Sequence, residues 1–137
     1  MNVVVANDIS ELGRLSDQLA QFWAEHALSP EMEGEVCLAL EEIVVNIMRY
    51  GHPEGGKHEI LVRLSFEGGL VTVAVEDDGV PFNPLEAMEP NLDLPLEERS
   101  IGGLGIHLVR NLMDGVEYRR EEGRNYLVMR KRVPVRA

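Results

Sequence analysis

Three short segments of this chain carry groups that could take part in chemistry, and the first is a glutamate and an asparagine four residues apart. Glu42 and Asn46 lie in a stretch with helical periodicity. Side chains at i and i+4 lie one above the other on a helix. A carboxylate and an amide so placed can hold a hard cation through oxygen, or one of them can orient a water. An ordinary solvated helix face would show the same pair.

The second segment ends a run of alternating valines at Asp77, followed by Asp78 and Gly79. Alternate residues of a strand share one face, so Asp77 continues the face of the valines before it. A carboxylate on the core side needs hydrogen-bond donors, because burying it without them is costly. The amino group of a bound base would be a suitable donor, and Gly79 would let a ligand approach the backbone. The alternative is an Asp-Asp-Gly turn with solvated acids.

The third segment is Gly102-Gly103-Leu104-Gly105, at the start of a predicted helix. Backbone N–H groups at a helix N-terminus bind anions, and glycines let phosphates approach. It is not a Walker loop, because no Gly-Lys-Ser/Thr follows, and it is not a Rossmann turn, because a long loop rather than a strand precedes it. The alternative is a flexible hinge between that loop and the helix.

Hydrophobic periodicity predicts the elements that must position these segments. Apolar residues recurring every three or four positions predict helices at 9–28, 31–50 and 103–113. Short β-branched or alternating runs predict strands at 3–5, 59–66, 70–77, 116–120 and 126–132. This order predicts an α+β two-layer sandwich, in which helices cover one face of a mixed, mainly antiparallel sheet.

One long loop is predicted at residues 80–100, which hold four prolines, many acidic residues and no helix or strand period. Loops longer than about 15 residues are uncommon in compact domains and are usually functional. The loop runs directly into the glycine segment, so we expect the two to act together.

Composition restricts the classes to which the chain can belong. Its 137 residues favour a single domain over 1–137. A net charge of −11 argues against broad nucleic-acid binding, and no apolar run approaches the ~20 residues of a membrane span. With Cys37 as the only cysteine, an intramolecular disulfide is impossible and a cytoplasmic location fits. We read the histidines as surface or helix-packing residues, because their spacing is not that of metal ligands: His26, His52, His58 and His107.

Taken together, the three segments resemble the GHKL ATPase superfamily in their order and spacing. The resemblance is carried by Glu42-x-x-x-Asn46, Asp77-x-Gly79-x-Pro81-Phe82 and Gly103-x-Gly105. Within that superfamily, EEIVVNIMRYGH, VEDDGVPFNP and GGLGIHLVRNLMD look like the small bacterial anti-sigma-factor serine/threonine kinases. The resemblance covers nearly the whole chain and implies a Bergerat-type ATP-binding fold.

The resemblance also implies a role for each matching residue. Glu42 matches the residue proposed as general base, and Asn46 matches the ligand of Mg²⁺. Asp77 matches the carboxylate that accepts a hydrogen bond from the adenine amino group, with Gly79 beside it. Pro81 stands where a second glycine is familiar, a substitution common in this branch.

The remaining roles concern the phosphates. The loop at about 80–100 corresponds to the ATP lid, and Gly103, Leu104 and Gly105 match the segment that closes with it on the phosphates. Arg99 is the only cation in the lid, and it lies two residues further from the glycines than a γ-phosphate-binding arginine usually would. Phosphoryl transfer depends on neutralising charge around the γ-phosphate, so this departure bears on chemistry more than on nucleotide binding.

The function that the resemblance implies is an ATP- and Mg²⁺-dependent serine/threonine kinase and anti-sigma-type regulator in a partner-switching system. Its expected substrate is a small antagonist of the STAS-type anti-anti-sigma kind, with a sigma factor as a further candidate partner and a homodimer as the expected assembly. One alternative is an ATP-dependent module that sequesters partners without phosphorylating them. Another is a detached histidine-kinase catalytic domain, which would need a partner with a histidine-bearing helix.

Overall fold

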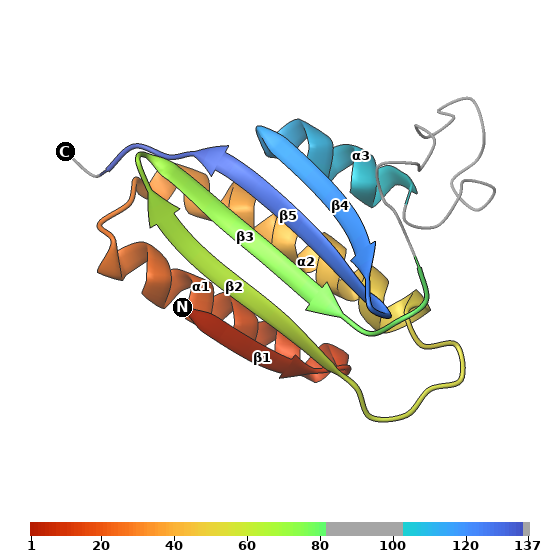
Figure 1. The fold of residues 1–137 in the computed structure, drawn as a ribbon. Helices are drawn as coiled ribbons and strands as arrows, with labels where there is room; N and C mark the ends of the chain where they lie inside the picture. The colour runs from red at the N-terminus through yellow and green to blue at the C-terminus, as the bar shows by residue number, and fades with distance from the viewer. Residues whose placement is uncertain (82–102, 136–137) are drawn as a thin grey trace.

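The computed structural model describes residues 1–81 and 103–135, which form a five-stranded sheet with helices on one face (Figure 1). The strands are β1 (Asn2–Ala6), β2 (Glu59–Glu67), β3 (Leu70–Asp77), β4 (Gly115–Glu121) and β5 (Arg124–Arg132). The helices are α1 (Leu12–Glu25), α2 (Glu33–Tyr50) and α3 (Gly103–Leu112). The predicted α+β two-layer fold is therefore confirmed. No helix within the described residues is long and apolar enough to cross a membrane.

The sheet has the order β1-β2-β3-β5-β4, and all four pairings between these strands are antiparallel. The prediction of a mixed sheet was thus too broad, since these pairings include no parallel one. β5 is the last strand in the chain but lies between β3 and β4. Its register places Asn125 opposite Asp77, at the end of β3. This pairing brings the C-terminal hairpin to the segment that carries the predicted adenine ligand.

Helix α1 is shorter than the predicted 9–28, and local chemistry explains both ends. The side chain of Asp8 accepts a hydrogen bond from the Ser10 amide at 2.9 Å, which caps a 3₁₀ turn at Ile9–Glu11 before the α-helix begins. At the other end, Ala27 has a φ of 50°. This left-handed conformation turns the chain out of the helix and lets Leu28 return to the core.

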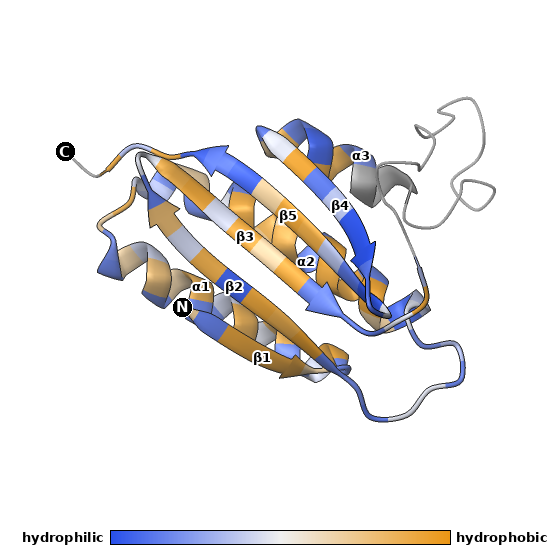
Figure 2. Ribbon diagram, in the orientation of Figure 1, coloured by the Kyte–Doolittle hydropathy of each residue, from blue (hydrophilic) through white to orange (hydrophobic). Residues whose placement is uncertain are grey.

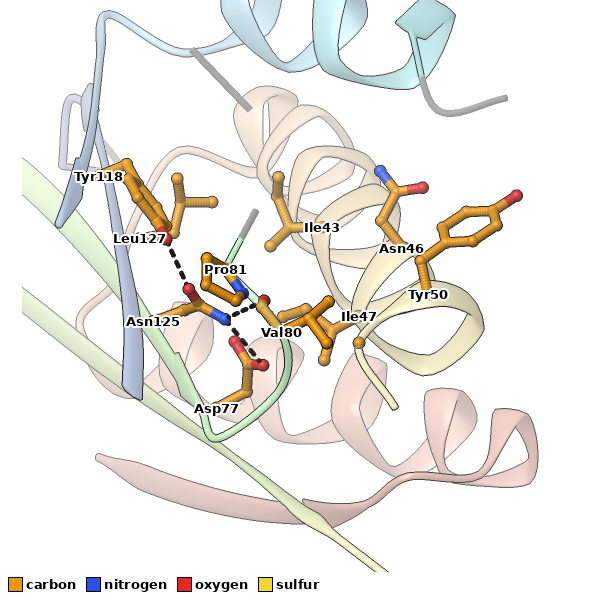
Figure 3. Close-up of a pocket in the computed structure, with 11 residues that line it drawn as sticks. Ile43, Asn46, Ile47, Tyr50, Asp77, Val80, Pro81, Tyr118, Asn125 and Leu127 are labelled. Atoms are coloured by element: carbon orange, nitrogen blue, oxygen red, sulfur yellow. Dashed lines mark hydrogen bonds between the residues drawn. The ribbon is translucent and has the colours of Figure 1, made fainter. Parts of the chain in front are cut away.

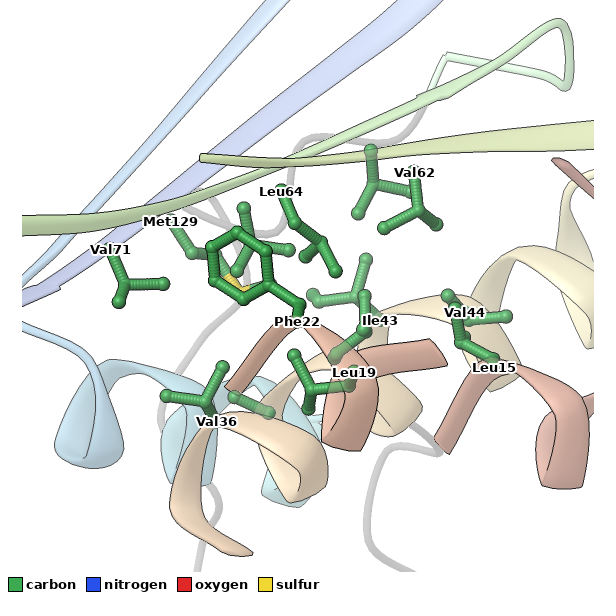
Figure 4. Close-up of a cluster of buried hydrophobic side chains, with 14 of the residues drawn as sticks. Leu15, Leu19, Phe22, Val36, Ile43, Val44, Val62, Leu64, Val71 and Met129 are labelled. Carbon is green, nitrogen blue, oxygen red and sulfur yellow. The ribbon is translucent and has the colours of Figure 1, made fainter. Parts of the chain in front are cut away.

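The core lies between the helices and the covered face of the sheet (Figure 4). Hydrophobic residues alternate along β2 and β3, so one face of each strand is apolar (Figure 2). Phe22 and Trp23 of α1 are both buried, and the Trp23 indole N–H donates to the carbonyl of Ser29 at 2.7 Å. The buried groups of both layers include Leu15, Leu19, Val36, Ile43, Val44, Val62, Leu64, Val71 and Met129.

The C-terminus of α3 is fixed by a buried lysine of β5. The Lys131 ammonium donates to the carbonyl of Leu112, the last residue of α3, and forms an ion pair with Glu35 of α2 at 3.1 Å. A cation at a helix C-terminus also interacts favourably with the helix dipole. One side chain therefore holds two helices against the sheet.

Candidate functional site

A pocket opens where the end of β3 and the start of β5 meet the last two turns of α2 (Figure 3). It holds about 570 Å³ of empty space, its open mouth included. Apolar side chains make up much of the wall, and a few polar groups interrupt them, as is common in small-molecule sites. The wall consists of Ile43, Asn46, Ile47, Tyr50, Gly51, Asp77, Val80, Pro81, Tyr118, Asn125 and Leu127.

Asp77 lies on this wall with only 2% of its surface exposed. The solvated-turn alternative is therefore wrong for Asp77, whereas its neighbour Asp78 is exposed. The backbone N–H of Gly79 donates to Asp77 Oδ2 at 2.8 Å, and Asn125 Nδ2 donates to the same oxygen at 3.3 Å. The protein itself thus supplies two of the donors that a buried carboxylate needs. Within residues 1–81 and 103–135, no hydrogen bond ends on Asp77 Oδ1.

Asn125 connects the C-terminal hairpin to the turn at residues 77–81. Its amide nitrogen also donates to the carbonyl of Val80 at 2.9 Å, and its oxygen accepts from Tyr118 Oη at 2.5 Å. Arg120 donates to that oxygen at 3.1 Å and to the Gly79 carbonyl at 2.6 Å. With 6% of its surface exposed, Asn125 is a buried polar residue whose amide is well paired.

Sequence reasoning missed these three hairpin residues. The predicted strand began at 126, one residue after Asn125, so its position on the apolar face was not visible. The structure shows that Asn125 shares the buried face of β5 with Leu127 and Met129. A polar residue on the apolar parity of a strand is the signal that could have found it.

Gly79 is required by the packing of the protein itself. A Cβ atom at this position would lie 2.6 Å from the carbonyl oxygen of Gly51 and 2.7 Å from Asp77 Oδ2. The same Gly51 oxygen accepts a hydrogen bond from the Val80 amide at 2.8 Å. The close approach that was predicted for a ligand therefore occurs between the 77–81 turn and the C-terminus of α2.

Asn46 and Glu42 lie one turn apart on α2, as predicted, but in different surroundings. Asn46 lines the pocket with 8% of its surface exposed, and its Nδ2 is buried without a hydrogen-bond partner among the described residues. The solvated-face alternative is thus wrong for Asn46. Glu42 is half-buried and is not part of the pocket wall.

The other predicted site residues fall into two groups. Pro81 lines the pocket beside Asp77. Gly103, Leu104 and Gly105 form the first turn of α3, so the predicted helix start is confirmed. Arg99 and most of the predicted lid lie in residues 82–102, outside the described part of the chain.

Comparisons with known proteins identify relatives of this arrangement. The family model described as a histidine kinase-like ATPase domain matches residues 5–131. The serine/threonine-protein kinase BtrW of Bordetella bronchiseptica is 27% identical over 115 residues, which cover 80% of this chain and 81% of that protein. The anti-sigma F factor of Bacillus subtilis is 24% identical over 114 residues, which cover 83% of this chain and 68% of that protein.

A similar fold occurs among solved structures. The crystal structure of the RsbU and RsbW domains of a Mycobacterium tuberculosis protein matches 99% of this chain with a TM-score of 0.63. The match covers 34% of that longer chain at 15% sequence identity, so the likeness is one of fold.

Proposed function

The chain belongs to the histidine kinase-like ATPase domain family, and from this premise we propose that it binds Mg-ATP and phosphorylates a serine or threonine of a protein partner. The observation that carries the proposal is the buried Asp77 carboxylate on the wall of a largely apolar pocket. The names of two relatives, a serine/threonine-protein kinase and an anti-sigma F factor, support the same function. We propose a STAS-type anti-anti-sigma protein as the substrate and a sigma factor as a further partner.

The pocket suits an adenine ring. Ile43, Ile47 and Leu127 offer apolar surface to a flat heterocycle. The two hydrogen bonds that Asp77 accepts within the described residues both end on Oδ2, so Oδ1 remains to accept one from the adenine amino group. A buried carboxylate that accepts such a bond would distinguish an amino-substituted base from one with a carbonyl at that position.

Asn46 and the start of α3 would serve the phosphates. The Asn46 amide fits a role as Mg²⁺ ligand, because it lies on the pocket wall and offers an oxygen that suits a hard cation. Bound Mg²⁺ would neutralise charge on the phosphates. The backbone N–H groups of Gly103, Leu104 and Gly105 would bind phosphate oxygens at the helix N-terminus.

Glu42 would act as the general base. It precedes Asn46 by one turn and carries the carboxylate that would accept the proton of the attacking serine or threonine hydroxyl. Replacing Glu42 by Gln keeps the size and hydrogen bonding of the side chain but removes the proton acceptor. Phosphoryl transfer should then fall about 10²–10⁴-fold, while ATP affinity is retained.

The decisive measurement is transfer of radiolabelled phosphate from ATP to the cognate antagonist, together with the ATP affinity of each variant. Glu41→Gln is the matched control, because Glu41 is adjacent to Glu42 but pairs with Ser16 on the side of α1. Asn46→Ala should instead weaken the binding of Mg-ATP. If the wild type transfers nothing to a verified partner, the kinase proposal fails and the ATP-dependent sequestering module replaces it.

Two further parts of the proposal concern the oligomeric state and the location of the protein in the cell. The family resemblance favours a homodimer, which light scattering on the purified chain would test. It also favours a cytoplasmic location, which fractionation of the source cells would test.

A further inference from the structure

Two histidines and an aspartate gather beside the turn that carries Asp77. His52 follows α2, His58 precedes β2, and Asp78 follows β3. Their potential ligand atoms all lie within 4.8 Å of one another. His52 Nε2 is 2.9 Å from Asp78 Oδ1, and His58 Nδ1 is 3.3 Å from the same oxygen. Sequence spacing did not predict this grouping of His52 and His58 around one carboxylate.

The two imidazoles are stacked, with ring centroids 3.5 Å apart and planes inclined by 13°. One nitrogen of each ring lies beside the same carboxylate, and because a metal binds in the plane of an imidazole, one ring would have to rotate out of the stack to share an ion with the other. Side-chain exposure rises from 7% for His52 to 29% for His58 and 43% for Asp78. The cluster is thus anchored at a buried ring and open to solvent at its carboxylate.

Two of the donor-atom separations are close to those around a small cation. Zinc binds imidazole nitrogen and carboxylate oxygen at roughly 2.0–2.2 Å, so the ligand atoms of a tetrahedral site lie roughly 3.3 Å apart. The observed separations of 2.9 and 3.3 Å are close to this value.

We propose that His52, His58 and Asp78 form a site for a divalent transition metal of the Zn²⁺ class, with a fourth position open to water or another ligand. Imidazole ligands favour Zn²⁺, Ni²⁺ or Cu²⁺ over Mg²⁺ and Ca²⁺, which prefer oxygen. The site is therefore chemically distinct from the oxygen ligand expected of Asn46. It does not depend on the proposed kinase activity.

A metal here would join three segments, two of which also build the pocket. His52 follows Gly51, whose carbonyl accepts the Val80 amide at 2.8 Å, and Asp78 lies between Asp77 and Gly79. A bound ion would tie the C-terminus of α2 to the start of β2 and to the 77–81 turn. The fold would be stabilised by mass action, because the three ligands are assembled only in the folded chain.

The test is a Zn²⁺ titration of the metal-stripped, full-length chain without nucleotide, in competition with a chromophoric chelator. We expect one Zn²⁺ per chain. His52→Gln, His58→Gln and Asp78→Asn should each weaken binding by more than about 100-fold, since loss of an outer partner of a ligand alone costs roughly 10–100-fold. Glu59→Gln, which changes the exposed neighbour of His58, is the matched control and should bind as the wild type does.

Two further readouts keep the proposal falsifiable. Zn²⁺ should raise the melting temperature of the wild type, and equal concentrations of Mg²⁺ or Ca²⁺ should not. If a variant fails to fold, the visible spectrum of the Co²⁺-loaded wild type decides, because a tetrahedral site absorbs far more strongly than an octahedral one. Zn²⁺ affinity that is unchanged in the folded variants, or a spectrum of octahedral Co²⁺ only, would overturn the site. Because ATP is absent, either result leaves the proposed nucleotide binding untouched.

Discussion

The two ends of β3 bury different kinds of side chain. At the start of the strand, Val71 and Val73 pack in the apolar core with Phe22 and Met129 (Figure 4). At its end, Asp77 lies in a buried polar network (Figure 3). The first end gains free energy from burial, about 1.5–3 kcal/mol for each large apolar side chain.

The second end gains little from burial, because a polar group that leaves water needs replacement hydrogen bonds merely to avoid a penalty. Asn125 and Gly79 supply such bonds to Asp77, whereas Asn46 Nδ2 lacks one among the described residues. The start of β3 therefore contributes mainly to the stability of the fold, and its end contributes mainly to ligand recognition. Substitutions at the apolar end should lower the free energy of unfolding, and those at the polar end should mainly lower ligand affinity.

The largest effect is expected for Phe22→Ala, which tests the apolar end. Phe22 is fully buried beneath the sheet, so its truncation leaves a cavity and should cost about 3–5 kcal/mol of unfolding free energy. Urea unfolding would measure this loss. Without urea, and at a temperature at which the variant is still folded, its ATP affinity should match that of the wild type. A large fall in the affinity of the folded variant would show that the two ends are coupled.

Asp77→Asn tests the polar end. The substitution preserves shape but replaces a charged acceptor, and loss of a charge-assisted hydrogen bond costs about 1.5–3 kcal/mol, roughly a ten- to hundredfold fall in ATP affinity. The free energy of unfolding should change by less than it does in Phe22→Ala. Isothermal titration and urea unfolding of the same preparation would compare the two quantities. Equal ATP affinities would remove Asp77 from the site.

Asn125→Ala should affect both quantities, because its amide connects the β4–β5 hairpin to the 77–81 turn. Leaving the buried partners unpaired should cost about 1–3 kcal/mol of unfolding free energy and also weaken ATP binding. Tyr118→Phe is the graded control, since it removes only one hydrogen bond and should cost about 0.5–1.5 kcal/mol. If Asn125→Ala changes neither quantity, the network does not hold the turn.

The smallest effect is expected outside both regions, at an ion pair in the first turn of α1. Arg14 donates to Glu11 and holds the pKa of Glu11 at about 2, below its usual value of 4.5, with help from the Ala6 amide. Because the folded pKa is depressed, the contribution to stability is present above about pH 4.5 and is lost as the pH falls toward 2. Glu11→Gln should make the urea unfolding midpoint slightly less dependent on pH over that interval, without changing ATP affinity. The effect is small because solvent screens the interaction between the two charges. An unchanged acid profile in urea melts would contradict this.

Most of the fold could be predicted from sequence, because hydrophobic period decides element type in segments as regular as 59–66 and 70–77. Strand parity also placed Asp77 on the buried face. The errors in the predicted structure arise where an unusual backbone conformation or the pairing of distant segments determines the fold. After α1, Ala27 adopts a left-handed φ that could not be predicted from its residue type. The roles of all the predicted site residues, Glu42 and Arg99 included, remain predictions.

The contacts of Asn125 and of the histidine cluster could not be predicted from sequence, for a related reason. Asn125 reaches Asp77 only through the β3–β5 register, and that pairing crosses 48 positions of chain. His52 and His58 meet Asp78 only because the C-terminus of α2 packs against the turn after β3. Long-range geometry of this kind leaves no trace in residue spacing.

The order of the strands also has a consequence for how the protein is made. The final strand of the chain fills the gap between β3 and β4, so β3 has an unpaired edge until the ribosome has delivered residues 124–132. Pairing between such distant segments is intrinsically slow. A chain that ends before β4 keeps the residues of all three helices and of β1 to β3 but has neither Asn125 nor Lys131. We expect such fragments to bind ATP more weakly than a chain that includes the β4–β5 hairpin, because they lack the Asn125 bonds that hold the 77–81 turn.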